Sequence, residues 1–378
     1  MRGRPELNRL NCTGVYLHSV QVYRSAPSRA SPWRATVDSS RAPVAALPSS
    51  PSALPHTPGG IGGFVGAETA FRAPAAFHPE AMRLSSARAA LALVLDHLRP
   101  RRVFLPDWVC DTVLEPVRAS GTTAIRLEVG PSLLPVRIPT PEYDELLLLV
   151  DPFGLGRPAV EARAPLGQRL LVDATQALYQ PPPAGCWGIA SARKFLGVPD
   201  GAFVWGPVPL SPPSRSNTRV TGTHLLARAA GAPEALSHYR TNEAALSTDL
   251  LAPAPLSDAL LDRIDHDEVK RRRSANAAVL HARLKAHNQL VLPDPLPADA
   301  VPMAYPFLPA RAVPHTALYA EQIWVPRLWP ERQEDGLPYT RHLSQHLLPL
   351  PCDQRYDAVH MHHIADVLLA AMAGSGRR

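Results

Sequence analysis

The sequence has few of the residues that build disulfide scaffolds and zinc sites. Its 378 residues include only four cysteines, Cys12, Cys110, Cys186 and Cys352. None belongs to a CxxC pair or to another metal-ligand spacing, so we expect reduced thiols and a cytoplasmic setting. The histidine tract at residues 360–363 has no nearby acid or cysteine set to complete a site. We therefore predict no metal.

Long apolar stretches are also missing. The longest, residues 146–150 and 367–372, fall far short of the ~18 residues that a membrane-spanning helix needs. No apolar signal-peptide core precedes a cleavage site. The sequence therefore predicts no membrane association.

Charge is unevenly distributed. The formal net charge is +6, but residues 1–60 carry seven arginines against Glu6 and Asp38, so the rest of the chain is nearly neutral. This basic excess lies outside the periodic sequence, so we expect no nucleic-acid partner. Residues 1–58 lack sustained periodicity, which favours a disordered extension or a start codon assigned too early over a transit peptide.

Lysine is the scarcest basic residue. Only Lys194, Lys270 and Lys285 occur among 39 basic residues, so arginine is used almost wherever charge alone is needed. Arginine cannot replace lysine where a primary amine must lose its proton and attack a carbonyl. Lys194 follows small residues and precedes the glycine-bearing stretch 197–201. This context makes Lys194 a candidate nucleophile.

An aspartate lies 21 residues before this lysine. Asp173 ends the apolar run of residues 170–172, as a strand terminus would. Strand-terminal aspartates are common, and neither residue is informative alone. Together they indicate a pyridoxal phosphate site, where an aspartate keeps the pyridine nitrogen protonated and a lysine holds the aldehyde as a Schiff base.

The hydrophobic pattern alternates between strands and helices from residue 60 onwards. Ser86 precedes a helical pattern through residue 95, and Gly121 follows another at residues 110–120. Strands are predicted at 102–106, 124–129, 145–150, 169–172 and 201–205, the last three resembling buried strands of a parallel sheet. We predict an α/β fold with a mostly parallel sheet. The expected division is an extension at 1–58, a large cofactor-binding domain at 59–255 and a small α/β domain at 256–378.

The chain resembles the DegT/DnrJ/StrS aminotransferases, which are fold-type-I pyridoxal phosphate enzymes of the aspartate aminotransferase superfamily. The resemblance spans residues 60–378. It rests on residues 86–91, 105–108, 173–177, 191–194 with 199–201, 301–306 and 350–356. The blocks around Asp173 and Lys194 are specific together, whereas the block at 86–91 is weak alone.

The resemblance implies a role for each site residue. Lys194 would bind the cofactor and move the substrate proton, and Asp173 would pair with the pyridinium. Gln176 would lie near the phenolic oxygen and Trp108 on the ring face. The phosphate would contact Ser86, Ala87, Arg88 and Ser191, consistent with anion binding at a helix N-terminus.

The resemblance further implies a homodimer, with Asn217 or Arg219 as the first candidates to reach the partner's phosphate. Residues 323–330 contain Trp324, Arg327 and Trp329 where family members hold substrate with a histidine- and proline-bearing stretch. This departure predicts a different pocket wall.

Three functions stay open at this point. An aminotransferase would move an amino group from an amino acid, with glutamate favoured, to a keto or aldehyde acceptor such as a keto-sugar nucleotide. A lyase or dehydratase on the same fold is a second reading, although family dehydratases replace the lysine with histidine. A non-catalytic binding protein is a third, and it should have lost Asp173 or Lys194.

Overall fold

One seven-stranded sheet forms the centre of the protein. The computed structural model describes residues 59–374, so the predicted extension at 1–58 lies outside the described residues. The strand order is β2-β8-β7-β6-β5-β3-β4. The strands are β2 (Met82–Leu84), β3 (Arg102–Pro106), β4 (Thr123–Leu127), β5 (Glu145–Val150), β6 (Leu170–Asp173), β7 (Trp187–Ser191) and β8 (Ala202–Trp205). The predicted α/β class is confirmed.

Most of the sheet is parallel, as predicted. β4, β3, β5, β6 and β7 run in one direction, and β5, β6 and β7 are buried along their whole length. The reading of 201–205 as a parallel-type strand was wrong, because β8 runs antiparallel to both β7 and β2. Only residues 192–201 separate β7 from β8, and a parallel crossover needs a dozen residues or more.

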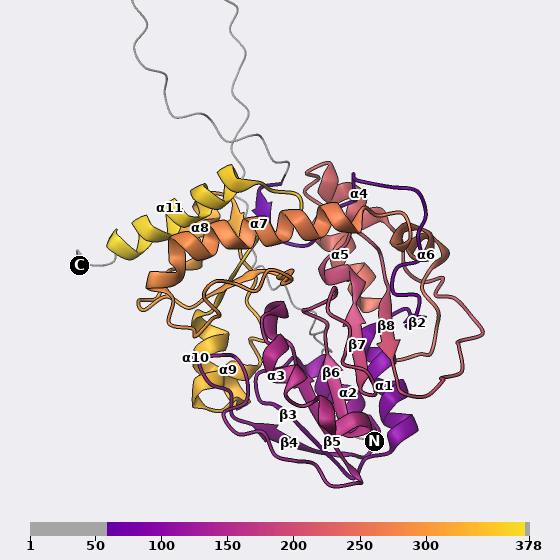
Figure 1. Ribbon diagram of the computed structural model, residues 1–378. Helices are drawn as coiled ribbons and strands as arrows, with labels where there is room; N and C mark the ends of the chain where they lie inside the picture. Colours follow the sequence, from indigo (N-terminus) through magenta and orange to yellow (C-terminus); the bar gives the residue numbers. More distant parts are fainter. Residues whose placement is uncertain (1–58, 375–378) are drawn as a thin grey trace, which may run out of the picture.

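Helices cover the sheet and extend beyond it (Figure 1). Two predicted helix ends are confirmed: Ser86 caps α1, and Gly121, at φ 75°, follows the end of α2. No helix within residues 59–374 is long and apolar enough to cross a membrane. The helices are α1 (Ala87–Leu98), α2 (Asp111–Ala119), α3 (Arg157–Glu161), α4 (Thr223–Ala229), α5 (Ala235–Ala244), α6 (Pro255–Leu261), α7 (His266–Leu284), α8 (His315–Ala320), α9 (Arg332–Asp335), α10 (Pro338–His346) and α11 (Ala358–Gly374).

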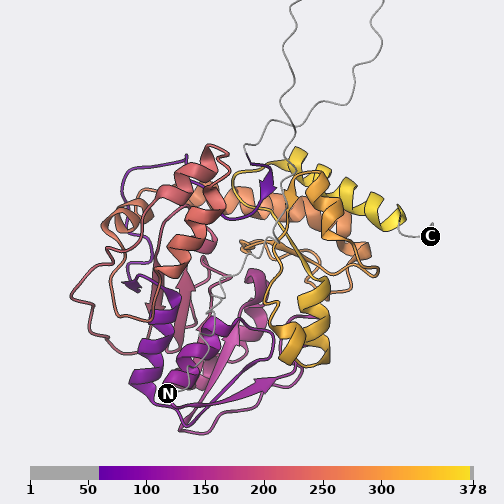
Figure 2. The same cartoon turned by 180° about the vertical axis from the view of Figure 1, so that it is seen from behind.

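The C-terminal third has a hydrophobic core of its own. Figures 1 and 2 show α7 and α11 side by side at one end of the molecule, with the large sheet below them. Their buried faces pack around the antiparallel pair β9 (Tyr305–Phe307) and β11 (Leu348–Leu350). Ile61, from the beginning of the described chain, belongs to the same core. The boundary between domains near residue 255 stays a prediction.

The glycine-rich segment at residues 59–63 is an integral part of the fold. Such a glycine-rich segment has the composition of a flexible linker, but β1 (Ile61–Gly62) pairs in parallel with β10 (Ile323–Trp324). Gly62 has φ 94°, and a Cβ there would lie 2.2 Å from the Trp324 carbonyl oxygen. Glycine is therefore required by the close approach of the two strands. The segment of residues 59–65, called the strap below, joins the beginning of the described chain to its C-terminal third.

Candidate active site

A cavity of about 190 Å³ opens where β6 and β7 end and α1 begins. Ligands of open α/β sheets bind at such carboxyl ends of strands. The sheet and its following turns contribute Asp173, Thr175, Gln176, Ile189, Ser191, Arg193 and Lys194, here called the strand-end wall. The C-terminal third contributes Met303, Ala304, Trp324, Pro326, Leu328, Trp329, Pro349 and Pro351, here called the C-terminal wall.

Asp173 and Lys194 meet in this cavity. Asp173 is the last residue of β6, and Lys194 ends the single helical turn Ala192–Lys194 that follows β7. β6 and β7 are parallel neighbours, so both residues leave the sheet at the same edge. Thr175 links them: its N–H donates to Asp173 Oδ1 at 2.9 Å, and its Oγ1 accepts from Lys194 Nζ at 3.0 Å. An amine and a buried carboxylate thus share one small space.

Gln176 lies in the same wall and is only 2% exposed. Its burial required a hydrogen-bond partner. The partner is the Phe153 N–H, which donates to Gln176 Oε1 at 2.8 Å. This bond fixes the amide in orientation beside Asp173.

The start of α1 supplies the positive end of the cavity. Ser86, Ala87 and Arg88 line it, together with Ser191. The Ser86 hydroxyl is already committed, because it accepts from Ala89 N–H at 3.1 Å and donates to the Ser247 carbonyl at 2.7 Å. Ser86 therefore holds the helix end in place, while the first turn of α1, which contains no acidic residue, faces the site.

Trp108 lies beside the cavity but does not line it. Its ring packs edge-on against Trp329, with 4.3 Å between ring centroids, and it is 2% exposed. Cys110, Thr112 and Val113 reach the cavity from the same part of the chain. Its indole belongs to the core that supports Trp329, and its place on the cofactor ring stays a prediction.

Asn217 and Arg219 are engaged within their own chain. Asn217 is buried, and its side-chain amide donates to Asp200 Oδ2 at 3.0 Å. Arg219 pairs with Asp249 at 2.6 Å. Neither lines the cavity of its own chain, and their reach toward a partner's phosphate stays a prediction.

Sequence reasoning missed three polar residues of the site: Arg193, Tyr239 and Glu243. Arg193 immediately precedes Lys194 and lines the cavity, as does Tyr239 of α5. Glu243, also on α5, forms an ion pair with Arg193. Burial disfavours charge on Arg193, but the Glu243 carboxylate and the other groups around it outweigh burial and raise the pKa of Arg193. Arginine is so common in this chain that no signal in the sequence distinguished this one.

Two charged residues from the C-terminal third also reach the cavity, but both are engaged. Arg273 is fully buried and donates to the Gln354 side chain at 2.8 Å and to the Met303 and Phe195 carbonyls at 3.0 and 2.8 Å. Asp353 forms a bidentate ion pair with Arg355 at 2.7 and 2.9 Å. The pKa of Asp353 is lowered because Arg355 outweighs the opposing effect of burial. The C-terminal wall is therefore mainly apolar.

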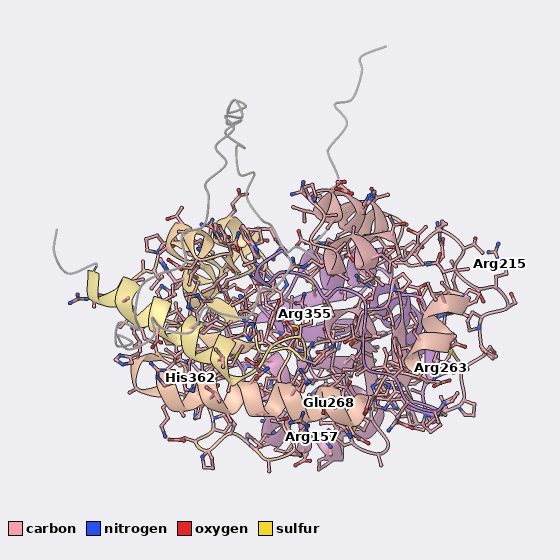
Figure 3. All side chains as sticks on the ribbon, turned by 90° about the horizontal axis from the view of Figure 1, so that it is seen from above. Arg157, Arg215, Arg263, Glu268, Arg355 and His362 are labelled. Atoms are coloured by element: carbon pink, nitrogen blue, oxygen red, sulfur yellow. The ribbon has the colours of Figure 1, made fainter. Side chains whose placement is uncertain are left out.

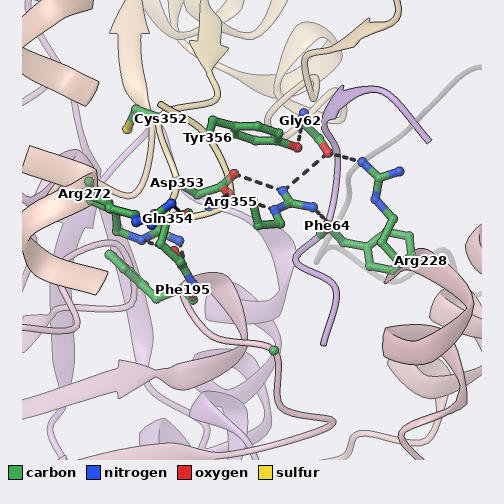
Figure 4. A network of polar contacts seen from close by, with 12 residues as sticks. Gly62, Phe64, Phe195, Arg228, Arg272, Cys352, Asp353, Gln354, Arg355 and Tyr356 are labelled. Carbon is green, nitrogen blue, oxygen red and sulfur yellow. Dashed lines mark hydrogen bonds and ion pairs between the residues drawn. The ribbon is translucent and has the colours of Figure 1, made fainter. Parts of the chain in front are cut away.

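The strap closes one side of the cavity with Gly63, Phe64 and Val65. Figure 4 shows the polar network that holds it. Arg355 donates to the Phe64 carbonyl at 3.0 Å, and the Gly62 N–H donates to the Tyr356 hydroxyl at 2.8 Å. Arg228 of α4 donates to the Gly62 carbonyl at 2.7 Å. Seen from above, Arg355 lies in the interior of the molecule, whereas Arg215 and Arg263 lie at its edge (Figure 3).

No protein-family model matches the sequence, and no curated protein matches it. Solved structures do match its fold. The aminotransferase TlmJ from Streptoalloteichus hindustanus has a TM-score of 0.56 and 16% identity, covering 79% of this chain and 87% of its own. DesV from S. venezuelae, in complex with a ketimine intermediate, has a TM-score of 0.53 and 20% identity, covering 76% and 83%. The sugar aminotransferase CalS13 from Micromonospora echinospora has a TM-score of 0.52 and 15% identity, covering 77% and 87%.

The chain has the fold of the fold-type-I, pyridoxal phosphate-dependent aminotransferases. This confirms the predicted fold class down to the fold type. The residues present also fit that cofactor. An amine lies beside a buried carboxylate at one part of the cavity, and a helix N-terminus with two arginines lies at another. This donor set matches an aldehyde, a pyridine nitrogen and a phosphate.

Proposed function

We propose that this protein is a pyridoxal phosphate-dependent aminotransferase. The observation that carries the proposal is the meeting of Asp173 and Lys194 in one cavity, bridged by Thr175, although 21 residues separate them in the sequence. When bound, the cofactor would supply an electron sink for the carbanion formed at the substrate carbon. The protein's own groups would then bind, orient and move protons.

Each site residue has a distinct task in this proposal. Lys194 would hold the cofactor aldehyde and then carry the proton to and from the substrate carbon, with Thr175 Oγ1 as its hydrogen-bond partner. Asp173, kept from solvent at 3% exposure, would hold the proton on the pyridine nitrogen. The Gln176 amide, fixed by Phe153 N–H, would face the phenolic oxygen.

The substrates are inferred less directly. We propose an amino-acid donor, with glutamate first, and a keto or aldehyde acceptor that uses the same site in turn. A keto-sugar nucleotide is the first acceptor to test, because matched structures include the sugar aminotransferase CalS13 and DesI studied with a TDP-sugar product. We also propose a homodimer, as the resemblance to fold-type-I enzymes implies.

Borohydride trapping tests the cofactor assignment. The purified protein should be yellow and should lose that absorbance on reduction, with the cofactor fixed to the peptide that contains Lys194. Lys194→Ala should abolish covalent trapping. Lys270 and Lys285 are the other two lysines of the chain, so a peptide map identifies the site without ambiguity. Trapping at either of them would refute the role of Lys194.

A half-reaction separates transamination from the alternatives. Addition of L-glutamate alone should convert the cofactor band and release one equivalent of 2-oxoglutarate per site. A lyase or dehydratase would turn over without exchanging the amino group. A non-catalytic binding protein would show no spectral change with any amine, although it would still bind the cofactor.

A further inference from the structure

Two arginines lie in the wall of the cavity near the start of α1: Arg88 is 8% exposed, and 11% of the Arg193 side chain is exposed. Arg88 is in the first turn of that helix, and Arg193 immediately precedes Lys194. Arg193 Nη1 forms an ion pair with Glu243, and Tyr239 also hydrogen-bonds to Arg193. Arg88 Nη1 donates to the Leu246 carbonyl at 3.2 Å. Both guanidinium groups are therefore fixed in place by the protein.

Each arginine keeps a buried N–H group without a hydrogen bond. Within residues 59–374, Arg88 Nη2 and Arg193 Nε are buried nitrogen atoms that contact no acceptor, and Arg88 is 8% exposed. A buried donor without an acceptor destabilises a protein. Arg88 and Arg193 both line the cavity, so these donors are candidates to bind a ligand there.

The charges of the cluster favour an anion. Glu243 is the carboxylate that acts on both Arg88 and Arg193, while Glu115 acts on Arg88 and Asp200 on Arg193. Lys194 and the N-terminus of α1 add further positive charge. Arg88 and Arg193 disfavour each other's charge, and burial acts in the same direction on Arg88, so the pKa of Arg88 is lowered. A dianion within reach of both would remove this repulsion.

We propose that Arg88 and Arg193 form a phosphate clamp, with Glu243 as the counter-ion that positions Arg193. The phosphate ester is that of the cofactor, and this identification of its source rests on the proposed function. The clamp supplies its charge within one chain.

The clamp predicts that substitutions at Arg193 and at Glu243, which form one ion pair, change phosphate affinity in opposite directions. Protein freed of cofactor would be melted in sulfate or inorganic phosphate against chloride at matched ionic strength. Arg193→Met and Arg88→Met should each weaken phosphate binding about tenfold or more. Glu243→Gln should melt lower in chloride, yet bind phosphate severalfold more tightly, because it removes a negative charge. Equal losses in Arg193→Met and Glu243→Gln would show a merely structural pair and would overturn the proposal.

A second ion pair provides the control. Arg83 of β2 pairs with Asp258 at 2.8 Å and with Asp262, and it does not line the cavity. Arg83→Met should lower the melting temperature without changing the response to phosphate. If Arg83→Met loses the response as Arg193→Met does, general destabilisation explains the effect and the clamp is refuted.

Affinity for pyridoxal phosphate and for pyridoxal, which lacks the phosphate, gives a readout separate from catalysis. Arg193→Met should reduce the preference for pyridoxal phosphate about tenfold and leave pyridoxal binding unchanged. An unchanged preference with intact trapping at Lys194 would refute the clamp and keep the proposed function. An Arg193-dependent phosphate response without trapping at Lys194 would keep the clamp and refute the proposed function.

Borohydride-reduced holoprotein identifies the source of the phosphate. If the cofactor fills the clamp, inorganic phosphate should no longer shift the melting temperature of the reduced protein. A persisting shift that depends on Arg193 would assign the clamp to a phosphorylated substrate and would overturn the cofactor assignment.

Discussion

The two walls of the cavity differ in chemistry and in how readily the sequence reveals them. The strand-end wall holds a carboxylate, an amine and a guanidinium within two adjoining turns of the large sheet. The C-terminal wall is built mainly from tryptophan, proline and leucine, and the charged residues near it are bound to other protein groups. Bond chemistry needs particular functional groups, whereas an apolar wall needs shape. The comparison therefore predicts that the strand-end wall acts on the cofactor and that the C-terminal wall selects the substrate.

Among the substitutions considered, Asp173→Asn should cause the largest loss, and the quantity lost is the rate of the reaction. An amide cannot keep the pyridine nitrogen protonated, so the electron sink is lost. Breaking a buried charge pair costs about 3–5 kcal/mol, which corresponds to a rate loss on the order of a thousandfold if it is expressed in the transition state. Single-turnover kinetics with saturating glutamate would measure it.

Asp151→Asn is the matched control, because Asp151 follows the neighbouring strand β5 and lies outside the cavity wall. Its rate should stay within a few-fold of that of the parent. Near-normal turnover in Asp173→Asn would remove Asp173 from the mechanism.

The strap pairs with the C-terminal wall at Trp324, and Gly62→Ala should break that pairing. The new Cβ would meet the Trp324 carbonyl oxygen at 2.2 Å, and φ is 94°. We expect a loss of roughly 2–4 kcal/mol in the free energy of unfolding from strain and strand separation. Gly121→Ala has φ 75° but nothing within 4 Å of the added carbon, so it should cost roughly 1 kcal/mol from backbone strain alone. Urea denaturation would compare them. Equal losses would mean that the close approach of β1 and β10 is unimportant.

The strand-end wall could be predicted from the sequence because its residues are either of a rare type or stand at the end of a recognisable element. Lys194 stood out among three lysines, and Asp173 ended an apolar run. Ser86 was recognised as a helix cap, and the structure confirms it. The direction of β8 was missed because direction depends on connection length, and β7 was missed because Gly188 and Ala190 are weak strand formers. The C-terminal wall was predicted only in part. The sequence pointed to a pocket wall at residues 323–330, and Trp324 and Trp329 line the cavity although Arg327 does not. Leu328 and Pro349 were missed because they have the appearance of ordinary core residues in a sequence.

Leu328→Ala tests whether the two walls have separate functions. Leu328 lines the cavity and is only partly buried, so shortening it should alter the fit of the acceptor with little effect on the fold. Loss of a few methyl or methylene contacts changes discrimination between substrates by 10- to 200-fold at most, and we expect about tenfold in kcat/KM between a small and a large acceptor. Trapping of the cofactor at Lys194 should be unchanged. A loss of trapping would show that the two walls are not functionally separate.

The smallest expected effect is a pH-dependent change in stability that comes from Asp151. Asp151 and Asp173 stand at the ends of neighbouring strands, and the effect belongs to Asp151. Val150 lies opposite Asp173 in the sheet, so Asp151 follows β5 just beyond that position. Asp151 is 2% exposed, and its Oδ1 accepts from the Gly156 N–H at 2.7 Å. Burial raises the pKa of Asp151 to about 6 from an ordinary value of 3.8, although the Gly156 bond and Arg157 oppose the shift.

Because this pKa is raised on folding, the folded protein binds more protons than the unfolded chain between about pH 4 and pH 6. The contribution of Asp151 to stability therefore rises as the pH falls through about 6. Between pH 7.5 and 5, the parent should gain about 1 kcal/mol of unfolding free energy relative to Asp151→Asn. His224 and His266, whose pKa values burial lowers to about 4, act in the opposite direction but cancel in this difference. Urea titrations of both proteins at the two pH values would measure it. A difference that is constant with pH would mean that Asp151 titrates as an exposed carboxylate does and that burial does not raise its pKa.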